Sequence, residues 1–355
     1  MADYTAIDNP TDFFRTKLYS GNNNPQNIAW DETDTNMAPD WLWIKSRAGN
    51  SVFSHVLGDS VRGGGKYLVS DTNAAEVANN NVIASFNTNG FSVGGATTVS
   101  ESGRTYVAWG WKANGSGSEN TVGDLTVTAL SVNQTAGISI GRITDGFTST
   151  GSNSETIGHG LGAIPQVIII KNRDATSNWE IYHAQLGNTK KIKLNSTDGS
   201  ADSTLFDNTT PTSSVWSVRG GDFATGEDVV FYAFAEKQGY SKFGIYQGTA
   251  GNNATAPFVY TGFKPSWLMV KNASATSAWE IYDSKSLGYN DQNHQLRANA
   301  NDALSAVSDY VDFVSNGFKV RHNSTGINEA ADNFIYMAFA ESPFITSTGV
   351  PATAR

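Results

Sequence analysis

The sequence predicts a mainly β protein made of three tandem antiparallel β-sandwich or jelly-roll-like domains with few short helices. Three observations support this prediction: one motif occurs three times, each copy is followed by an aromatic-rich strand, and turn-forming residues are abundant. The chain has 355 residues, 35 of them Gly, and only 16% are charged, against about 25% in typical globular domains. Because glycine accepts positive φ without steric cost, this composition favours short strands joined by many turns.

The first marker is a proline, one polar residue, four apolar residues and a lysine. A run of four apolar residues does not alternate, which indicates a strand buried on both faces or between two sheets. Proline fits the first residue of such a strand, where no ladder N–H is needed. The three copies are Pro39-Asp40-Trp41-Leu42-Trp43-Ile44-Lys45, Pro165-Gln166-Val167-Ile168-Ile169-Ile170-Lys171 and Pro265-Ser266-Trp267-Leu268-Met269-Val270-Lys271.

The second marker is a strand that combines aromatic residues with alanine near the end of each copy. From the proline to the matching aromatic residue the separations are 70, 69 and 74 residues, for Pro39 to Trp109, Pro165 to Phe234 and Pro265 to Phe339. Markers in one order at nearly constant spacing indicate three copies of about 100 residues, each large enough for its own core.

These markers divide the chain into three repeats. Repeat 1 is expected at 1–112 and is the most divergent, repeat 2 at 137–242 and repeat 3 at 243–345, followed by a C-terminal tail at 346–355. Residues 113–136 begin with a Gly- and Ser-rich stretch and continue with strand-like alternation, so we expect a linker or a bridging strand there.

Composition and charge argue against several classes of protein. The net charge is −9 and no basic run exceeds a pair such as Lys190-Lys191, so a nucleic-acid partner is not expected. The absence of cysteine removes disulfides and thiolate chemistry. The apolar run at 167–170 is far too short for a membrane helix, and residues 1–8 lack the features of a secretory signal. We therefore expect no membrane insertion.

Histidines and glycine-rich loops give no sign of metal or cofactor chemistry. The five His residues show no metal-ligand spacing. His159 lies in the loop Gly158–Gly162, and we interpret it as a turn residue instead of a base or ligand. The stretch Gly63–Lys66 lacks the spacing of a phosphate-binding loop and is expected to be a hairpin tip. We predict no cofactor and no metal site.

Several acidic residues are candidates for acid/base pairs. Asp31-Glu32 and Glu227-Asp228 stand beside strand ends, where we expect solvated loops. Glu180 and Glu280 recur beside a tryptophan at matched positions of repeats 2 and 3, and repeat 1 has no clear equivalent. We therefore interpret them as outward-facing strand residues or inter-subunit contacts. The sequence predicts no catalytic residue and a protein that is not an enzyme.

Aromatic residues together with Asn- and Asp-rich loops form a plausible sugar-binding combination, because aromatic faces stack on sugar rings and amides bond their hydroxyls. Most of the tryptophans lie in the marker strands, however, and are expected in the core. The sequence alone does not place Trp216. The ligand-binding residues therefore stay unassigned. The marker tryptophans are Trp41, Trp43, Trp109, Trp111, Trp179, Trp267 and Trp279.

Several longer stretches resemble a repeat domain of virion structural proteins from tailed bacteriophages, especially marine phages and cyanophages. Repeat 1 looks like a divergent branch of the same family, and the resemblance covers nearly the whole chain. It implies a component of the exterior of a phage particle and carries no catalytic or binding residues. The stretches are Ile157–Pro165, Ile170–Arg173, Phe234–Gly244, Phe258–Pro265 and Tyr336–Glu341.

The leading hypothesis from the resemblance is a tail fibre or other tail appendage that contributes to host attachment. Expected partners are further copies of the chain in a homotrimer, other virion proteins of the tail or capsid, and a host surface glycan. Three alternatives remain open: a capsid decoration or head-fibre protein, a tail-borne polysaccharide depolymerase, and a lectin-like adhesin.

Overall fold

A computed structural model describes residues 5–48, 53–147, 154–219, 223, 225–287, 289–290 and 292–351. Residues 352–355 of the expected C-terminal tail lie outside this part. The prediction of a mainly β fold is confirmed, because the described residues form antiparallel strands together with two α-helices of four residues each.

The elements follow the chain in the order of the repeats. Repeat 1 contains η1 (Pro10–Asp12), β1 (Phe14–Ser20), β2 (Gln26–Ala29), β3 (Trp41–Ser46), β4 (Val56–Asp59), β5 (Lys66–Tyr67), β6 (Val77–Ala78), β7 (Ile83–Asn87), β8 (Gly90–Val93), α1 (Thr97–Ser100) and β9 (Thr105–Trp111). The stretch 113–136, expected as a linker or bridging strand, contains β10 (Ser118–Asn120) and β11 (Val127–Asn133).

Repeats 2 and 3 continue the same alternation of strands and turns. Repeat 2 contains β12 (Ile138–Ile143), β13 (Ser154–Gly158), β14 (Val167–Asn172), β15 (Glu180–His183), β16 (Lys190–Lys193), β17 (Ala201–Asp202), β18 (Val215–Arg219) and β19 (Val229–Phe234). Repeat 3 contains β20 (Ser241–Gln247), η2 (Asn253–Thr255), β21 (Phe258–Tyr260), β22 (Phe263–Asn272), β23 (Trp279–Asp283), α2 (Ser284–Leu287), β24 (Gln292–Arg297), β25 (Ser305–Val314), β26 (Gly317–Val320) and β27 (Asn333–Pro343). Strand β20 therefore lies across the boundary expected between 242 and 243.

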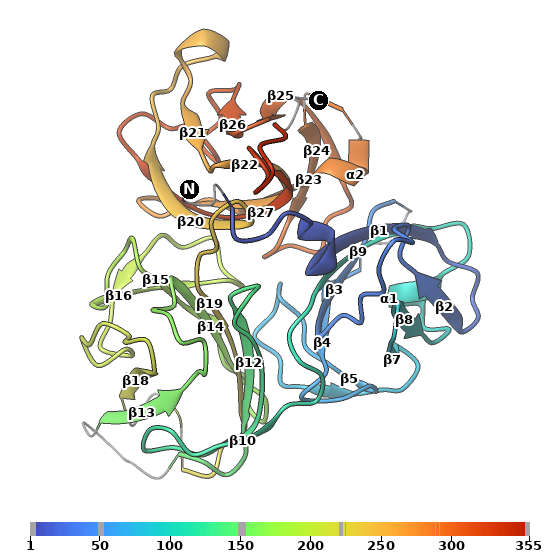
Figure 1. The fold of residues 1–355 in the computed structure, drawn as a ribbon, viewed down its shortest axis with the longest axis vertical. Helices are drawn as coiled ribbons and strands as arrows, with labels where there is room; N and C mark the ends of the chain where they lie inside the picture. The colour runs from blue at the N-terminus through green and yellow to red at the C-terminus, as the bar shows by residue number, and fades with distance from the viewer. Residues whose placement is uncertain are drawn as a thin grey trace.

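One strand order recurs in the three repeats. It is β1-β9-β3-β4 in repeat 1, β12-β19-β14-β15 in repeat 2 and β20-β27-β22-β23 in repeat 3. Further strands pair within each repeat, among them β2-β8, β13-β18 and β21-β26. Figure 1 shows the three lobes arranged around a common centre.

The central strand of each repeat is buried on both of its faces. In β14, Val167 and Ile169 face a core at the centre of the molecule, whereas Ile168 and Ile170 face the core of repeat 2 itself. Strands β3 and β22 divide their apolar residues in the same way. This confirms the two-sided burial predicted from the four-residue apolar runs. The central core draws on all three repeats, so the lobes form one body.

Strand register corrects one detail of the repeat alignment. Trp41 pairs with Trp111, as Val167 pairs with Phe234 and Trp267 with Phe339. Trp111, and not Trp109, is thus the equivalent of the two phenylalanines. The closing strand of repeat 1 carries tryptophan at both positions, and the sequence pattern alone does not separate them.

Three buried lysines, which we call the inter-repeat lysines, join neighbouring repeats. They are Lys45, Lys171 and Lys271, the last residues of the first marker, and each is at most 1% exposed. Each ammonium donates to a carbonyl of another repeat: Lys45 to Asn301 (2.8 Å), Lys171 to Asn73 (3.5 Å) and Lys271 to Thr197 (2.9 Å). The direction is the same around the ring, from repeat 1 to 3, from 2 to 1 and from 3 to 2. Burial lowers the pKa of each of these lysines to about 8.

A second set of bonds between repeats comes from one matched position: the residue before β4, the residue before β15 and the first residue of β23. Trp179 donates its indole N–H to Val69 O (2.8 Å), and Trp279 donates to Lys193 O (2.9 Å). In repeat 1 this position is His55, whose Nε2 lies 2.8 Å from Arg297 O. Because Trp43 Nε1–H donates to His55 Nδ1 (2.7 Å), the histidine proton must be on Nε2, which then donates to the carbonyl.

Candidate functional site

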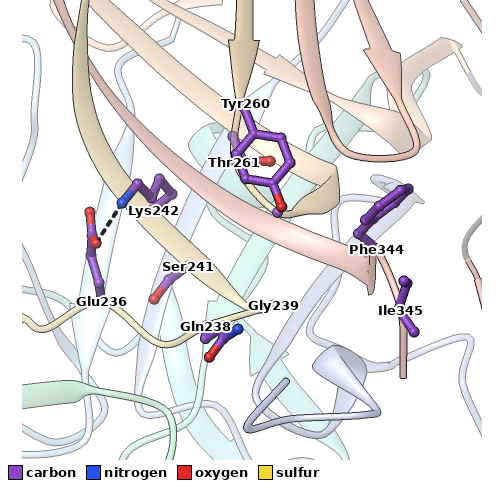
Figure 2. Close-up of a pocket in the computed structure, with 10 residues that line it drawn as sticks. Glu236, Gln238, Gly239, Ser241, Lys242, Tyr260, Thr261, Phe344 and Ile345 are labelled. Atoms are coloured by element: carbon purple, nitrogen blue, oxygen red, sulfur yellow. Dashed lines mark hydrogen bonds and ion pairs between the residues drawn. The ribbon is translucent and has the colours of Figure 1, made fainter. Parts of the chain in front are cut away.

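An open cavity of about 410 Å³ lies beside the start of β20, and we call it the repeat-3 cavity. Its volume is within the range of small-molecule sites, which is about 300–1,000 Å³. Figure 2 shows that aromatic and polar side chains share its wall. The lining residues are Glu236, Gln238, Gly239, Ser241, Lys242, Tyr260, Thr261, Gly262, Phe344 and Ile345.

Three chain segments build the wall of this cavity: the connection 235–240 before β20, the turn 261–262 after β21, and the residues after β27. Phe344 N donates to Gly262 O (3.1 Å), which fixes the last segment against the turn. Gly239 has φ +77°, and a Cβ on it would lie 2.1 Å from Thr5 Oγ1. Glycine is therefore required where the connection turns into β20.

Charges in the repeat-3 cavity are already paired with one another. Lys242 Nζ lies 2.9 Å from Glu236 Oε2, and Glu236 Oε1 accepts a bond from Phe243 N (2.9 Å). Tyr260 lines the same cavity and is 60% exposed. The wall thus includes an exposed aromatic ring and a neutralised ion pair.

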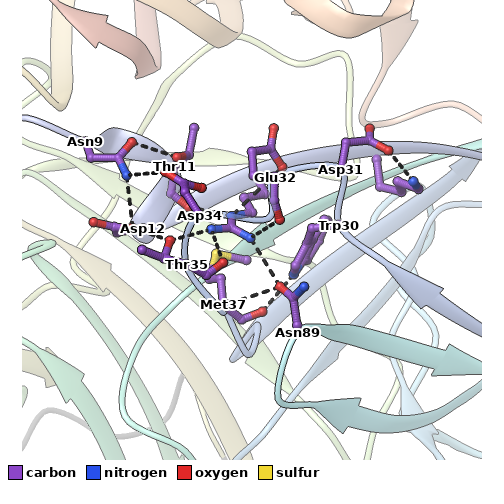
Figure 3. A network of polar contacts seen from close by, with 12 residues as sticks. Asn9, Thr11, Asp12, Trp30, Asp31, Glu32, Asp34, Thr35, Met37 and Asn89 are labelled. Carbon is purple, nitrogen blue, oxygen red and sulfur yellow. Dashed lines mark hydrogen bonds and ion pairs between the residues drawn. The ribbon is translucent and has the colours of Figure 1, made fainter.

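In repeat 1, the place equivalent to the repeat-3 cavity, which we call the corner of the repeat, is filled by a side chain. Arg15 pairs with Gly110 as Lys242 pairs with Ala338, so the two basic residues are equivalent. The Arg15 side chain is fully buried, and Figure 3 shows the loop residues that surround it. The loop 30–40, which closes over it, is much longer than the turn 261–262. The guanidinium donates to the carbonyls of Thr11 (2.6 Å), Glu32 (3.3 Å) and Thr35 (2.9 Å) and to the side chains of Asn89 (3.2 Å) and Thr35 (2.8 Å).

The corner of repeat 2 is filled in a different way. Gly158 pairs with Val215 as Tyr260 pairs with Gly317. A Cβ on Gly158 would lie 2.5 Å from Val122 O, so the chain around Val122 covers this corner. The backbone N–H groups of Asp124 and Leu125 donate to Thr156 O (2.8 and 3.1 Å). The segment 113–136 thus closes repeat 2, whereas the short connection 235–240 leaves repeat 3 open.

His159 lies at the same corner and organises its own loop. It is fully buried, Leu161 N donates to its Nδ1 (3.2 Å), and its Nε2 therefore donates to Thr212 O (3.2 Å). Burial lowers the pKa of the imidazole. These contacts agree with the interpretation as a turn residue. Gly63 and Gly65 have positive φ in the turn between β4 and β5, as expected for a hairpin tip.

The acidic pairs hold loops and repeats together. Asp228 bonds Arg173 (2.9 Å), and Glu76 of repeat 1 also bonds Arg173 (2.8 Å). Glu32 lies 3.3 Å from Lys285 of repeat 3. We expected solvated loops for these acidic residues. Asp31, whose side chain is 51% exposed, agrees with this expectation, whereas Glu32 and Asp228 are partly buried.

The matched glutamates differ from the expected outward-facing residues. Glu280 is 4% exposed, with Arg297 Nε 3.5 Å from its carboxylate. Burial raises the pKa of Glu280 to about 7. Glu180 is less deeply buried and pairs with Lys191 (3.2 Å). Register places Val56 at the equivalent position of repeat 1, which explains why the sequence showed no acidic counterpart there.

The marker tryptophans are core residues, as expected. All seven are at most 2% exposed, and Trp216 is 1% exposed. Trp216 pairs with Ile157 as Phe318 pairs with Val259, so it occupies the place of the phenylalanine in the core of repeat 2. Tyr260 was not singled out from the sequence. The signal that points to it is the short connection 235–240 in place of a segment like 113–136.

A smaller cavity of about 210 Å³ lies between repeats 1 and 3 and is lined by two glutamates, Glu32 and Glu341. Each carboxylate already has a lysine partner, Lys285 for Glu32 (3.3 Å) and Lys264 for Glu341 (3.0 Å). Within the described part of the chain, no group of His, Asp or Glu is placed to hold a metal ion. No helix in that part is long and apolar enough to cross a membrane.

The fold and these cavities define a β protein with three lobes around one aromatic core. Residues 9–343 match the family described as Domain of unknown function (DUF7483), and the chain belongs to this family. No curated protein and no solved structure matches the chain.

Proposed function

We propose that this protein is a non-enzymatic structural component on the exterior of a tailed-phage particle, a tail fibre or tail appendage that contributes to host attachment. The resemblance of its repeats to virion proteins motivates the proposal. One structural observation supports it: the residues shared by the repeats pack and bond the repeats to each other. The inter-repeat lysines and the marker tryptophans are examples. Such residues serve packing between repeats, which supports a structural role.

The proposal includes three β-sandwich units per chain and self-association into a homotrimer, together with contacts to other virion proteins. Low surface charge suits such interfaces, because Asn, Ser and Thr lose less rotamer entropy on immobilisation than Lys or Glu. Mass measurement by light scattering tests the trimer, and a chain mass of 38.0 kDa sets the scale. A mass near one chain at micromolar concentration would contradict self-association.

Immunogold labelling of intact particles with an antibody against the protein tests the location. We expect gold on the tail or its appendages. Gold at capsid vertices or facets would instead support the decoration or head-fibre alternative, and unlabelled particles would contradict a virion protein.

The depolymerase alternative has one observation in its favour, the two glutamates Glu32 and Glu341 that line one cavity. Incubation with host polysaccharide, followed by measurement of reducing ends, tests it. We expect no release of reducing ends. Release that is abolished by both Glu32→Gln and Glu341→Gln would establish the enzyme.

A further inference from the structure

We propose that the repeat-3 cavity binds a neutral hexose ring of a glycan, with Tyr260 as the stacking platform. This inference rests on the proposed role in host attachment and gives that role a defined site. Tyr260 is 60% exposed although it follows a buried strand residue, Val259. An exposed aromatic face beside polar groups suits the apolar face of a sugar ring. Phe344 and Ile345 add apolar wall to the same cavity.

Polar groups in the cavity suit an uncharged ligand. The Glu236–Lys242 pair is neutral as a unit, yet both side chains are partly exposed, 29% and 41%. A carboxylate accepts from sugar hydroxyls, while an ammonium donates to them. The exposed Gln238 amide lies in the same wall and offers both functions. A strongly charged ligand would have to break the existing pair.

The same corner argues against a peptide that extends the sheet. In repeat 2, β11 adds to β12, and Ser131 pairs with Ile140. Phe243 occupies the equivalent position of β20, and its N–H is capped by Glu236. A capped N–H and a charged side chain on an edge strand both oppose strand addition. The cavity therefore favours a small polar ligand over a partner's β-strand.

Repeats 1 and 2 show that the opening is particular to repeat 3. Their corners are filled by Arg15 with its loop and by the chain around Val122. A ligand at this place would thus bind once per chain. Single sites for sugar rings are weak, and several copies on one particle would supply avidity.

Saturation-transfer NMR on the full-length protein tests the inference, with methyl glycosides of glucose, galactose, mannose, N-acetylglucosamine and N-acetylgalactosamine as probes. We expect saturation transfer to at least one glycoside, and at least tenfold weaker binding by Tyr260→Ala. Tyr289→Ala is the matched control, because Tyr289 is 61% exposed and does not line the cavity. It should bind like the unmodified protein.

Two results would overturn the inference: no transfer to any of the probes, or unchanged binding by a folded Tyr260→Ala variant. Folding of the variant is checked by its near-UV circular dichroism. Binding of an extended peptide at β20 in place of every glycoside would also overturn it. Immunogold labelling of particles does not depend on this site, so failure of the sugar site and failure of the virion role are separate outcomes.

Discussion

Lys45, Lys171 and Lys271 occupy the same position in the three repeats, and all three are withdrawn from solvent. A buried ammonium is tolerated only when its hydrogen-bond capacity is used. Lys271 meets this condition with Thr197 O (2.9 Å) and Ser277 O (2.7 Å), one from each side of the boundary between repeats 2 and 3. The side chain thus joins the two repeats through its hydrogen bonds, and its removal should weaken the junction.

The first prediction is that Lys271→Met lowers the free energy of unfolding by about 1–3 kcal/mol, because buried carbonyls lose a donor. Urea denaturation measures the change. Lys193→Met is the control, since Lys193 is one third exposed and pairs with the exposed Asp198. Its effect should stay within about 0.5 kcal/mol. Equal effects of the two variants would contradict a joining role for Lys271.

The lowered pKa of these lysines also gives a dependence of stability on pH. In the folded protein each loses its proton near pH 8, whereas the unfolded chain holds it to about pH 10.4. The unfolded state binds more protons between these values, so stability rises there by up to about 1.4 kcal/mol per pH unit for each lysine. Between pH 8 and 9.5, the free energy of unfolding of Lys271→Met should rise with pH about one third less steeply than that of the unmodified protein, because one of the three lysines is gone. An unchanged slope would contradict the assignment.

At the scale of elements, the space between β3 and β4 is filled by different residues from those in the equivalent pairs β14-β15 and β22-β23. Repeats 2 and 3 place a tryptophan just before β15 and at the first position of β23, and a smaller residue, Ile169 or Met269, on the neighbouring strand. Repeat 1 exchanges the sizes, with Trp43 on β3 and His55 before β4. Their rings meet edge to face at 5.6 Å. Total volume is conserved, as close packing requires.

The third prediction follows from this exchange. His55→Trp alone should destabilise by about 1–3 kcal/mol through overpacking, and Trp43→Met alone by about 2–4 kcal/mol through a cavity. The double variant should lose at least about 1 kcal/mol less than the sum, because the indole introduced before β4 could then use the vacated space and the carbonyl of Arg297.

Chemical denaturation of the four proteins in this cycle gives the coupling energy. The pair Trp43→Met and Trp216→Phe is the control, since Trp216 lies in the separate core of repeat 2. These two changes should add within about 0.5 kcal/mol. Simple additivity in the first cycle would contradict the size exchange.

The strands could be predicted from the sequence because their signals are local. Four apolar residues after Pro165 already indicate two-sided burial, and Leu125–Leu130 already alternates like a strand. The repeat-3 cavity could not be predicted in this way. The cavity depends on the strand register, which places Lys242 opposite Ala338. It also depends on the short lengths of two connections, 235–240 and 261–262. The burial of Glu280 also depends on which layer covers β23, and no local pattern encodes that.

At the scale of the whole molecule, the central core decides how the repeats behave. It combines Trp41 and Trp111 from repeat 1 with Tyr232 from repeat 2 and Trp267 from repeat 3. Trp41 stacks on Tyr232 with centroids 4.6 Å apart, and Trp111 meets Trp267 edge to face at 5.5 Å. No repeat can keep these rings buried by itself, so each repeat depends on the other two.

The fourth prediction is a single cooperative unfolding transition for the whole chain, with coincident curves from tryptophan fluorescence and far-UV circular dichroism. The isolated fragment 137–242 should lack a cooperative transition, since its share of the central core would face water. Three separable transitions, or a fragment with native near-UV signals, would show that the repeats are independent domains.

Because the three lobes belong to one chain, their corners can differ from one another. An assembly of three identical polypeptides must display three identical corners, because one gene encodes each of them. Here the three repeats belong to a single polypeptide, so each corner has its own sequence. Arg15 fills the corner of repeat 1, the β10–β11 hairpin covers that of repeat 2, and the corner of repeat 3 is open beside Tyr260. Variation at the open corner can therefore proceed while the inter-repeat lysines and the central core go on joining the three lobes.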